Sequence, residues 1–449
     1  MMCQGRMRLF AGWLLLGSIL GIQAGTVLGA DRAPNIVLIV ADDLGWGDVG
    51  FNGRTEWTTP HLDRLAADGV VLKHCYSAAP LCGPSRGALL TGKYTIHTGV
   101  RRNDQDLPLE EVTIAEALKH RGYRSGLFGK WQHGKPRSGH DHYVHPMDQG
   151  FDDFFGFTDS YEALEKFPTQ LWRGRERVQV SGYVDDLITD RAIEFLGRQK
   201  DAPFFLDVSY LAPHFSIAAP AEEIEHLKGK VPEADPLHPQ NAIYAAMITR
   251  MDWNIGRLLD TLGRLHLIED TLLVFTSDNG ATFEFGNRGT SAALDSNRPL
   301  RGQKRTLWEG GIRVPGLAYW PGKIRAGQAC EENVHLTDLL PTLVATAGGT
   351  LDAAWHIDGV NVLPLWTGQG HAPERTLFWE WQSEGADQLA ALRGDLKLVI
   401  TRAGKPELYD LSADPAERRD LSATHPQRVQ QLQSELDAWM ATEDPRGKE

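Results

Sequence analysis

The sequence predicts an α/β protein with a mostly parallel central sheet between helices, followed by a small C-terminal α+β domain. Two apolar runs, residues 35–41 and 271–277, are typical of strands buried on both faces of a parallel sheet. Segments with helical and strand periodicity alternate between these runs, as they do in βαβ units. After Pro373 the pattern changes to short strand-like runs. We therefore expect a large domain over residues 31–372 and a small one over residues 373–449.

The length and charge of the chain narrow the classes of function. A chain of 449 residues exceeds the usual size of one compact core, which agrees with two domains. The formal net charge of −13 argues against a nucleic-acid or anionic membrane partner, because such a protein repels polyanions at long range. An anionic small substrate would then need a locally basic pocket.

The N-terminus has the layout of a secretory signal peptide over residues 1–30. Arg6 and Arg8 precede an apolar run at residues 9–22, and small residues follow up to Ala30. The run is broken by glycine and is shorter than the roughly 20 residues of a membrane-spanning helix. We therefore expect export, periplasmic or secreted, and no stable membrane span after cleavage.

The remaining elements follow from capping residues and periodicity. A helix is expected after Thr59-Pro60 with a stop at Gly69, and a capping box at residues 113–116 opens another. A long helix at residues 244–265 has one apolar stripe, which predicts packing against the core. The other expected elements are strands at residues 123–129, 204–211, 376–381, 388–393, 397–400 and 407–409 and a closing helix at residues 426–440.

Oxygen-bearing side chains follow the two buried strands. Asp42 and Asp43 come after the first strand, and Asp278 and Asn279 after the second. Ligands of open α/β sheets bind at the carboxyl ends of parallel strands, so these side chains should meet there. Each aspartate alone would be read as a turn former. Together they favour a hard cation, calcium before magnesium, because oxygen ligands without nearby histidine or thiolate suit such ions.

Cys82 opens a short expected helix that is closed by Gly92. The first backbone N–H groups of a helix lack intrahelical partners and favour an anion, and Arg86 adds a positive charge one turn on. A buried free cysteine beside an arginine is the alternative reading. Cys75 and Cys330 make no disulfide framework, and whether they pair stays open.

Three further charged residues follow expected strands or a long loop. Lys130 and Lys304 are candidates to bind an oxyanion, although a single lysine is usually a surface residue. His214 is the candidate proton donor for a leaving group, because histidine titrates near neutral pH. The histidine-rich stretch at residues 139–145 has no usual zinc spacing and no cysteine, so a solvated loop is the better interpretation.

In these motifs the chain resembles the type I sulfatases, the formylglycine-dependent branch of the alkaline phosphatase superfamily. The signature Cys-x-Pro-Ser-Arg is met by Cys82-Gly83-Pro84-Ser85-Arg86, and its continuation runs to Gly92. The resemblance extends from Pro34 to the helix at residues 432–439. Further matching motifs are Asp42-Asp43-Leu44-Gly45, Gly129-Lys130-Trp131, Ala212-Pro213-His214, Ser277-Asp278-Asn279-Gly280, Lys304 with Glu309-Gly310-Gly311, and Tyr409-Asp410-Leu411 with Asp414-Pro415.

The resemblance implies a large domain like that of alkaline phosphatase, and a modified active site. Cys82 would be oxidised to formylglycine by a formylglycine-generating or anaerobic sulfatase-maturating enzyme. One calcium ion per chain would be bound by the modified Cys82 together with Asp42, Asp43, Asp278 and Asn279. Arg86 would orient the aldehyde hydrate, Lys130 and Lys304 would hold sulfate oxygens, and His214 or a lysine would protonate the departing alcohol. Ser160 is a further candidate substrate-binding residue, because some members have a polar position there.

The chain departs from the family in one motif. The usual run Gly-Lys-Trp-His has Gln132 at its last position here, and the histidine follows as His133. Residues two apart on an extended segment share a face, so we expect Lys130 and Gln132 to line the pocket. Gln132 can hydrogen-bond the hydrate but cannot take its proton. Either a local bulge turns His133 inward, or another base serves the release of sulfate.

The resemblance implies hydrolysis of sulfate monoesters, of an aryl alcohol or a carbohydrate, to the alcohol and inorganic sulfate. One hydroxyl of the hydrate would attack sulfur, and the other would then expel sulfate, a route that a serine lacks. One alternative is a phosphomonoester or phosphodiester hydrolase on the same fold. The other is a non-catalytic binder of sulfated glycans, which only Gln132 supports. Trp172, Arg173, Arg175 and Arg177 are compatible with glycan binding, although a solvated face is commoner.

Overall fold

The structure is a computed structural model that describes residues 1–2, 33–134, 144–159, 162–199, 202–233, 240–283, 285–382, 387–401 and 404–442. The expected signal peptide lies outside the described residues except for its first two, and Ser160 lies outside them altogether. Residues 33–449 form one compact unit, which is the subject of the following description.

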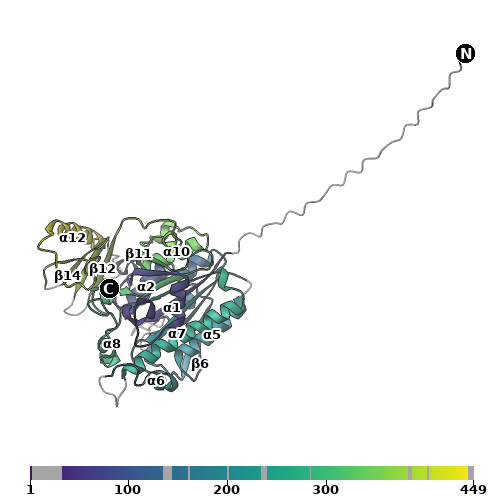
Figure 1. Cartoon of the computed structure of the whole chain (residues 1–449), viewed down its shortest axis with the longest axis horizontal. Helices are drawn as coiled ribbons and strands as arrows, with labels where there is room; N and C mark the ends of the chain where they lie inside the picture. The colour runs from purple at the N-terminus through teal and green to yellow at the C-terminus, as the bar shows by residue number, and fades with distance from the viewer. Residues whose placement is uncertain are drawn as a thin grey trace. The chain divides into compact units, whose positions relative to one another are not determined.

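The main sheet has eleven strands in the order β11-β2-β10-β8-β1-β7-β3-β4-β5-β6, with β9 paired to β2 (Figure 1). Five neighbouring strands from β8 to β4 are parallel, and β10 runs antiparallel between β2 and β8. This mixed sheet confirms the predicted α/β class. The strands are β1 (Asn35–Asp42), β2 (Val70–Tyr76), β3 (Arg124–Lys130), β4 (Asp153–Phe157), β5 (Gln170–Arg173), β6 (Glu176–Gln179), β7 (Phe204–Pro213), β8 (Thr271–Ser277), β9 (Arg313–Val314), β10 (Gly316–Tyr319) and β11 (Gln328–His335).

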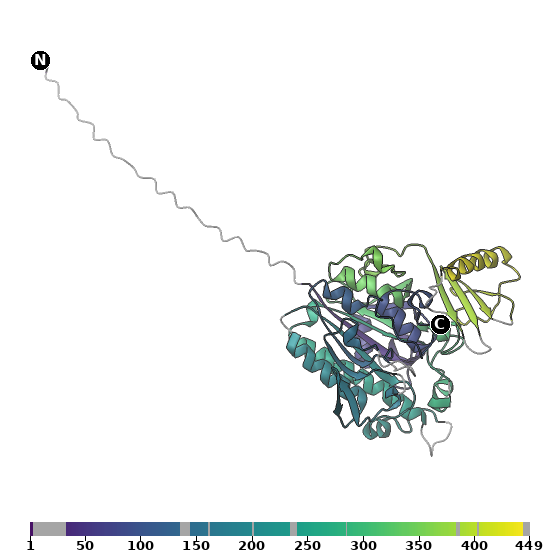
Figure 2. The ribbon, with the colours of Figure 1, turned by 180° about the vertical axis from the view of Figure 1, so that it is seen from behind.

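Helices cover both faces of this sheet, as Figures 1 and 2 show from opposite sides. Alternate residues of β1 enter two hydrophobic clusters, because successive side chains of a strand point to opposite faces. One cluster contains α1 (Pro60–Asp68), α5 (Val184–Gln199) and α7 (Gln240–Arg264). The other contains α2 (Cys82–Thr91), α4 (Ile114–Lys119), α10 (Leu339–Thr346) and α11 (Leu363–Trp366).

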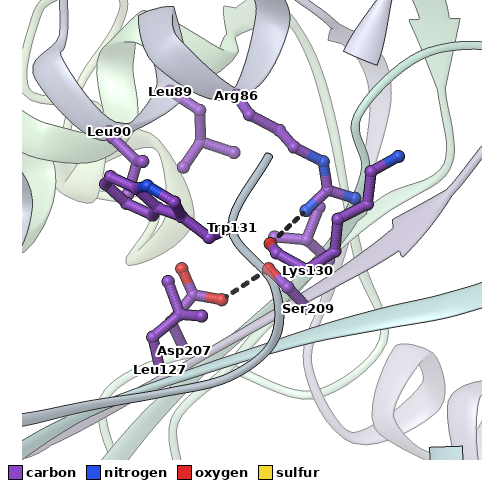
Figure 3. A pocket seen from close by; sticks show the side chains of 9 residues that line it. Arg86, Leu89, Leu90, Leu127, Lys130, Trp131, Asp207 and Ser209 are labelled. Atoms are coloured by element: carbon purple, nitrogen blue, oxygen red, sulfur yellow. Dashed lines mark hydrogen bonds between the residues drawn. The ribbon is translucent and has the colours of Figure 1, made fainter. Parts of the chain in front are cut away.

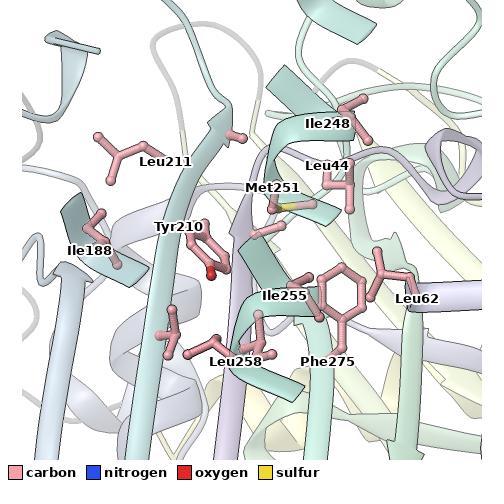
Figure 4. Close-up of a cluster of buried hydrophobic side chains, with 14 of the residues drawn as sticks. Leu44, Leu62, Ile188, Tyr210, Leu211, Ile248, Met251, Ile255, Leu258 and Phe275 are labelled. Atoms are coloured by element: carbon pink, nitrogen blue, oxygen red, sulfur yellow. The ribbon is translucent and has the colours of Figure 1, made fainter. Parts of the chain in front are cut away.

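The apolar stripe predicted for the long helix is the core-facing side of α7. Met251, Ile255 and Leu258 point toward Tyr210 of β7 and Phe275 of β8 (Figure 4). All five side chains are buried, and each such burial stabilises the fold by roughly 1.5–3 kcal/mol relative to exposure. This packing holds the central strands rigidly behind their carboxyl ends.

The C-terminal part is an antiparallel sheet with one helix, as expected for the small α+β domain. Its elements are β12 (Thr376–Trp381), β13 (Gln388–Arg393), β14 (Leu396–Thr401), β15 (Glu407–Asp410) and α12 (Pro426–Met440). One face packs on Leu432 and Leu436 of α12. The other places Trp379 in a cluster with Tyr76 of β2, so the two sheets share buried side chains. The predicted boundary at residue 372 stays a prediction.

Shorter elements connect these layers, and β3 and β7 run slightly beyond their expected ends, to Lys130 and Pro213. Cys75, Cys82 and Cys330 are all free thiols, so the open question of a Cys75–Cys330 disulfide is answered against it. The short helices are α3 (Thr95–Thr98), α6 (Ala221–Leu227), α8 (Thr290–Ala293), α9 (Glu309–Ile312) and the 3-10 turns Trp46–Asp48, Gly50–Asn52, Pro146–Asp148, Glu162–Leu164, Ile268–Asp270, Phe285–Asn287, Leu336–Asp338 and Ala353–Trp355.

Candidate active site

The carboxyl ends of β1 and β8 bring four oxygen-bearing side chains together. The two strands are parallel and pair Ala41 with Ser277, so the residues that follow lie side by side. The backbone N–H of Asp43 donates to Asp278 Oδ1 at 3.1 Å, and Asn279 Nδ2 donates to Asp43 Oδ1 at 2.8 Å. Asp43 has φ 62, a left-handed conformation that aspartate tolerates better than most residues. Asp42 is also fully buried here.

Three cations reach this group from other parts of the chain. Lys304 Nζ donates to both carboxylate oxygens of Asp43, at 2.8 and 2.9 Å. Lys130 Nζ, at the end of β3, donates to Asp42 Oδ2 at 2.6 Å. Arg86 Nε, one turn into α2, donates to Asp278 Oδ2 at 2.7 Å. Each carboxylate therefore has a cation, and all three cations are buried.

The crowding of the carboxylates shifts their acidity. Burial raises the pKa of Asp43, and the negative charge of Asp42 raises it further, although Lys304 opposes both effects. Burial also raises the pKa of Asp278 to about 6 against the opposing charge of Arg86. For Asp42 the surrounding positive charges, Lys130 among them, outweigh burial and lower the pKa. Carboxylates that repel one another in a buried site are the arrangement that a divalent cation stabilises.

The donor atoms fit a hard cation. Asp42 Oδ1 and Asn279 Oδ1 are buried and have no hydrogen-bond partner among the residues that the structure describes. One ligand atom each from Asp42, Cys82 and Asp278 lie within 4.8 Å of one another, and the same holds for Asp42, Asp43 and His214. Carboxylate and amide oxygens are the ligands that calcium prefers, so the unpartnered oxygens make this cluster compatible with such an ion.

Cys82 is the first residue of α2 and faces the same group. Gln132 Nε2 donates to Cys82 Sγ at 3.0 Å, and Asn103 Nδ2 does so at 3.5 Å. Asn103 Oδ1 also accepts from the backbone N–H of Gly83 at 2.9 Å, which satisfies one of the free donors of the helix start. The side chain of Cys82 is thus held between the helix start, the segment after β3 and the loop that carries Asn103.

The segment after β3 turns Gln132, and not His133, toward Cys82. Gln132 has φ 80, which reorients the chain directly after Trp131. His133 is fully buried and packs edge to face on Trp131, with ring centroids 5.5 Å apart. Burial lowers the pKa of His133 to about 3, so its ring is neutral. Of the two alternatives, the structure has no bulge that brings His133 to Cys82.

His214 follows the end of β7 and completes the group. Its Nε2 lies 3.8 Å from Asp43 Oδ2. Its Nδ1 is hydrogen-bonded to the backbone carbonyl of Phe215, and because a carbonyl only accepts, Nδ1 is the donor. The His214 ring stacks on that of Phe215 with centroids 4.2 Å apart. The orientation leaves Nε2 as the nitrogen that faces the carboxylates.

The comparisons with known proteins agree with this geometry. A family model described as Sulfatase matches residues 34–349. The chain belongs to the sulfatase family. A second model, N-sulphoglucosamine sulphohydrolase, C-terminal, matches residues 302–444. The resemblance carried by the Cys82 motif is confirmed, and with it the class of enzyme, sulfuric ester hydrolase.

Named relatives and solved structures extend the match over most of this sulfatase. Human arylsulfatase A is 33% identical over 464 residues, which cover 90% of this chain and 86% of the relative. Human N-acetylgalactosamine-6-sulfatase is 33% identical over 387 residues, covering 78% and 69%. The structure of Ps i-CgsB in complex with k-i-k-neocarrahexaose superposes with a TM-score of 0.82 at 29% identity, covering 91% and 93%.

Two residues beside the site were missed from the sequence. Lys166 is buried, and its Nζ donates to the carbonyls of Ala163 at 2.9 Å and Phe215 at 3.3 Å. Burial lowers the pKa of Lys166 to about 8. Asn103 lies in a charged stretch that reads as surface. Nothing in the local sequence signals either residue, because their placement depends on how loops fold back over the sheet edge.

The aromatic and basic hairpin β5–β6 is not part of this group. β5 runs antiparallel to β4 and pairs Arg173 with Phe155, so the turn after it lies toward the amino-terminal end of β4. Arg177 stacks 4.3 Å over the ring of Trp172, and Arg175 pairs with Asp148. The hairpin therefore extends away from the strand ends that carry Lys130.

Proposed function

We propose that this sulfatase hydrolyses sulfate monoesters to an alcohol and inorganic sulfate through a formylglycine formed from Cys82. The observation that carries the proposal is the convergence of three buried cations and four oxygen-bearing side chains around Cys82. A sulfate ester is an anion, and a buried cluster of fixed cations stabilises the charge that develops on its transfer. N-acetylgalactosamine-6-sulfatase and the neocarrahexaose complex of Ps i-CgsB support a sulfated carbohydrate as substrate. Human arylsulfatase A, which is equally identical, supports an aryl sulfate.

Calcium is the proposed metal, one ion per chain. Asp42, Asp43, Asp278 and Asn279 would hold it together with the modified Cys82. The ion would supply fixed positive charge next to the nucleophile and the transferring group. Lys130 and Lys304 donate hydrogen bonds to sulfate oxygens, and Arg86 orients the residue at position 82.

The proposed modification of Cys82 needs a maturation enzyme. The group supplies a hydrated aldehyde as the nucleophile and an internal route for sulfate release. Cys82 is only 1% exposed in the folded chain. A formylglycine-generating or anaerobic sulfatase-maturating enzyme must therefore act before α2 packs against the sheet.

Proton transfer is assigned to His214 and positioning to Gln132. His214 holds a proton at Nδ1 on the carbonyl of Phe215, and burial lowers its pKa well below the usual value, so Nε2 is unprotonated in the free site. Nε2 passes a proton to the departing alcohol only after the ring has taken up a second proton, and a lysine is the alternative donor. Gln132 donates to the nucleophile but has no titratable proton, so it orients without acting as the base. Ser160 remains a proposed substrate contact outside the described residues.

Two measurements on the purified enzyme test this function. Mass spectrometry of the tryptic peptide should show position 82 about 18 Da lighter than cysteine, as conversion of the thiol to an aldehyde requires. Release of sulfate from 4-nitrophenyl sulfate and from defined sulfated saccharides should exceed release of phosphate from 4-nitrophenyl phosphate, and Cys82→Ala should abolish it. Faster phosphate release would favour the phosphoester hydrolase. Unmodified Cys82 with saccharide bound and no sulfate released would favour a binding protein.

Export is proposed with the same function. In the described part of the chain, no helix is long and apolar enough to cross a bilayer. Residues 1–30 are the proposed signal peptide. Sequencing the N-terminus of the protein recovered outside the cytoplasm should begin near residue 31, and an intact Met1 on that fraction would contradict cleavage.

A further inference from the structure

A small cavity lies directly behind the active-site cations, between α2 and the central sheet. Arg86 and Leu89 line it from α2, Asp207 and Ser209 from β7, and Trp131 from the segment after β3 (Figure 3). The space open to the centre of a water molecule is about 10 Å³. One buried water needs roughly 10–15 Å³ by this measure and two to four polar partners, so the cavity has room for a single water.

Asp207 is an unusual residue for its place. It lies in the middle of β7, paired with Leu38 of β1 and Leu127 of β3, and is 2% exposed. Its carboxylate has one hydrogen-bond partner in the described part of the chain, the hydroxyl of Ser209 at 2.8 Å. A buried carboxylate is unfavourable unless it is paired or well hydrogen-bonded. An apolar side chain at this position would stabilise the buried strand more than a carboxylate does. We therefore expect the Asp207 carboxylate to have a functional role.

Arg86 is incompletely held on the side that faces this cavity. Its Nε donates to Asp278 at 2.7 Å, whereas its Nη1 reaches the carbonyl of Lys130 only at 3.4 Å. Its Nη2 has no partner in the described structure. Asp207 makes no direct hydrogen bond to Arg86, although Arg86 is the charged group that acts on its acidity. A carboxylate and a guanidinium thus face one cavity without touching.

We propose that the cavity binds one water molecule that joins the Asp207 carboxylate to Arg86 Nη1, and that Asp207 is thereby a positioning residue for Arg86. The water accepts from the guanidinium and donates to the carboxylate, with the Ser209 hydroxyl and the Lys130 carbonyl nearby as further partners. Arg86 is then fixed at Nε and Nη1, and Nη2 stays free for the nucleophile or the sulfate.

The kinetic part of this inference rests on the proposed function, in which Arg86 orients the residue at position 82 beside the sulfate. A guanidinium that is free to tilt would keep its charge near the sulfate but lose its alignment. Misalignment of a catalytic group by about 1 Å can cost up to 100-fold in rate. The loss should therefore appear in kcat more than in KM.

Three variants distinguish the effect of losing the water from the effect of losing the Asp207 carboxylate. Asp207→Leu removes the partner, Val40→Ile adds a methyl group from the cavity wall to exclude the water, and Asp207→Asn keeps a side chain that can still hold it. We expect kcat to fall about 10-fold or more in the first two and less in Asp207→Asn, with KM changed less than about threefold. Asp252→Asn is the matched control, because Asp252 is a buried carboxylate that caps α1 by accepting from the N–H groups of His61 and Leu62. It should leave kcat unchanged.

A crystal structure at high resolution tests the water without reference to activity. We expect density for one water within about 3 Å of both Asp207 and Arg86 in the unaltered enzyme, and none in Val40→Ile. A dry cavity in the unaltered enzyme would overturn the inference, whether or not sulfate is released. Wild-type kcat in Asp207→Leu, or equal losses in Asp207→Leu and Asp207→Asn, would also overturn it. Failure of the proposed function would appear differently, as no sulfate release by the unaltered enzyme.

Discussion

Two of the buried charge clusters in the described structure differ in one respect. The strand-end cluster consists of Asp42, Asp43, Asp278, Lys130 and Lys304, with Arg86 beside it. The inter-sheet cluster consists of Glu309, Lys397 and Glu417, with Tyr76 and Arg313 beside it, and lies where β14 of the small sheet meets α9. All members of both clusters are buried.

The two clusters differ in whether their buried polar atoms have hydrogen-bond or ion-pair partners. In the inter-sheet cluster Lys397 Nζ lies 2.8 Å from Glu309 Oε1 and 2.9 Å from Glu417 Oε1. The remaining oxygens accept from Tyr76 Oη at 3.0 Å and from the backbone N–H of Glu309 at 2.7 Å. Among the described residues, Asp42 Oδ1, Asn279 Oδ1 and Arg86 Nη2 of the strand-end cluster have no hydrogen-bond partner. Glu417 Oε1 of the inter-sheet cluster also lacks a hydrogen bond but keeps its ion-pair contact with Lys397. We call the inter-sheet cluster closed, because its charges are paired with one another, and we expect it to stabilise the contact between the two sheets. We call the strand-end cluster open, because some of its polar atoms can still bind a metal ion or a substrate.

The largest effect expected from this contrast is on stability. Lys397→Met leaves Glu417 buried without a cation and leaves Glu309 with only Arg313, whose Nη1 lies 3.4 Å from Glu309 Oε2. Breaking a buried pair costs about 3–5 kcal/mol of unfolding free energy. Urea unfolding measures the loss. The enzyme that remains folded should keep kcat within about threefold, because Lys397 touches no atom of the proposed site.

A triple variant serves as the control for that prediction. Glu309→Gln, Lys397→Met and Glu417→Gln together remove the charges while keeping the shapes, so they should destabilise less than Lys397→Met alone. A triple variant less stable than the single one would show that the ion pairs themselves stabilise the junction.

At the strand-end cluster we expect a substitution to lower kcat more than it lowers stability. Lys304→Met removes a cation that we assign to sulfate oxygens, and the loss of one such group costs roughly 100- to 1,000-fold in kcat, or about 3–4 kcal/mol. Lys323→Met, a lysine of the surface turn after β10, is the matched control and should have no effect on kcat. A kcat near the wild-type value in Lys304→Met would end the assignment of Lys304 to the sulfate.

Calcium should stabilise only the open cluster. Binding to the native state alone adds about 2.7 kcal/mol when free calcium is 100 times its Kd, so the thermal midpoint should rise with calcium and fall with a chelator. Asp42→Asn removes a proposed ligand and should reduce the shift. A midpoint that does not respond to calcium in the unaltered enzyme would contradict the proposed metal.

The sequence predicted those parts of the site that depend on local pattern. Asp42 and Asp278 follow apolar runs, and parallel strands of one sheet must end at the same edge, so their meeting could be inferred. The inter-sheet cluster could not, because Glu309 and Lys397 are far apart in the chain and only the docking of the second sheet joins them. Asp207 was hidden inside a run that reads as an apolar strand, and β10 is too short to signal an antiparallel strand.

The spacing predicted that Gln132 faces the pocket with Lys130, unless a bulge turned His133 inward. Gln132 does reach Cys82, but it does so through a positive φ and not along the extended segment that the prediction assumed. This φ depends on the backbone of the segment after β3, which pairs with β4 and its following residues through bonds such as Trp131 N–H to Phe157 O at 2.9 Å. The sequence alone does not show this pairing, and so it does not show the turn at Gln132.

The smallest expected effect concerns these two neighbours. Gln132→Ala removes a hydrogen bond to the nucleophile but no charge and no proton donor to substrate, so kcat should fall about 10-fold with little change in stability. His133→Ala removes a buried ring that packs on Trp131, so it should cost roughly 1–3 kcal/mol of stability and leave kcat within about twofold. A loss of turnover in His133→Ala with none in Gln132→Ala would reverse the assignment and return His133 as the base for sulfate release.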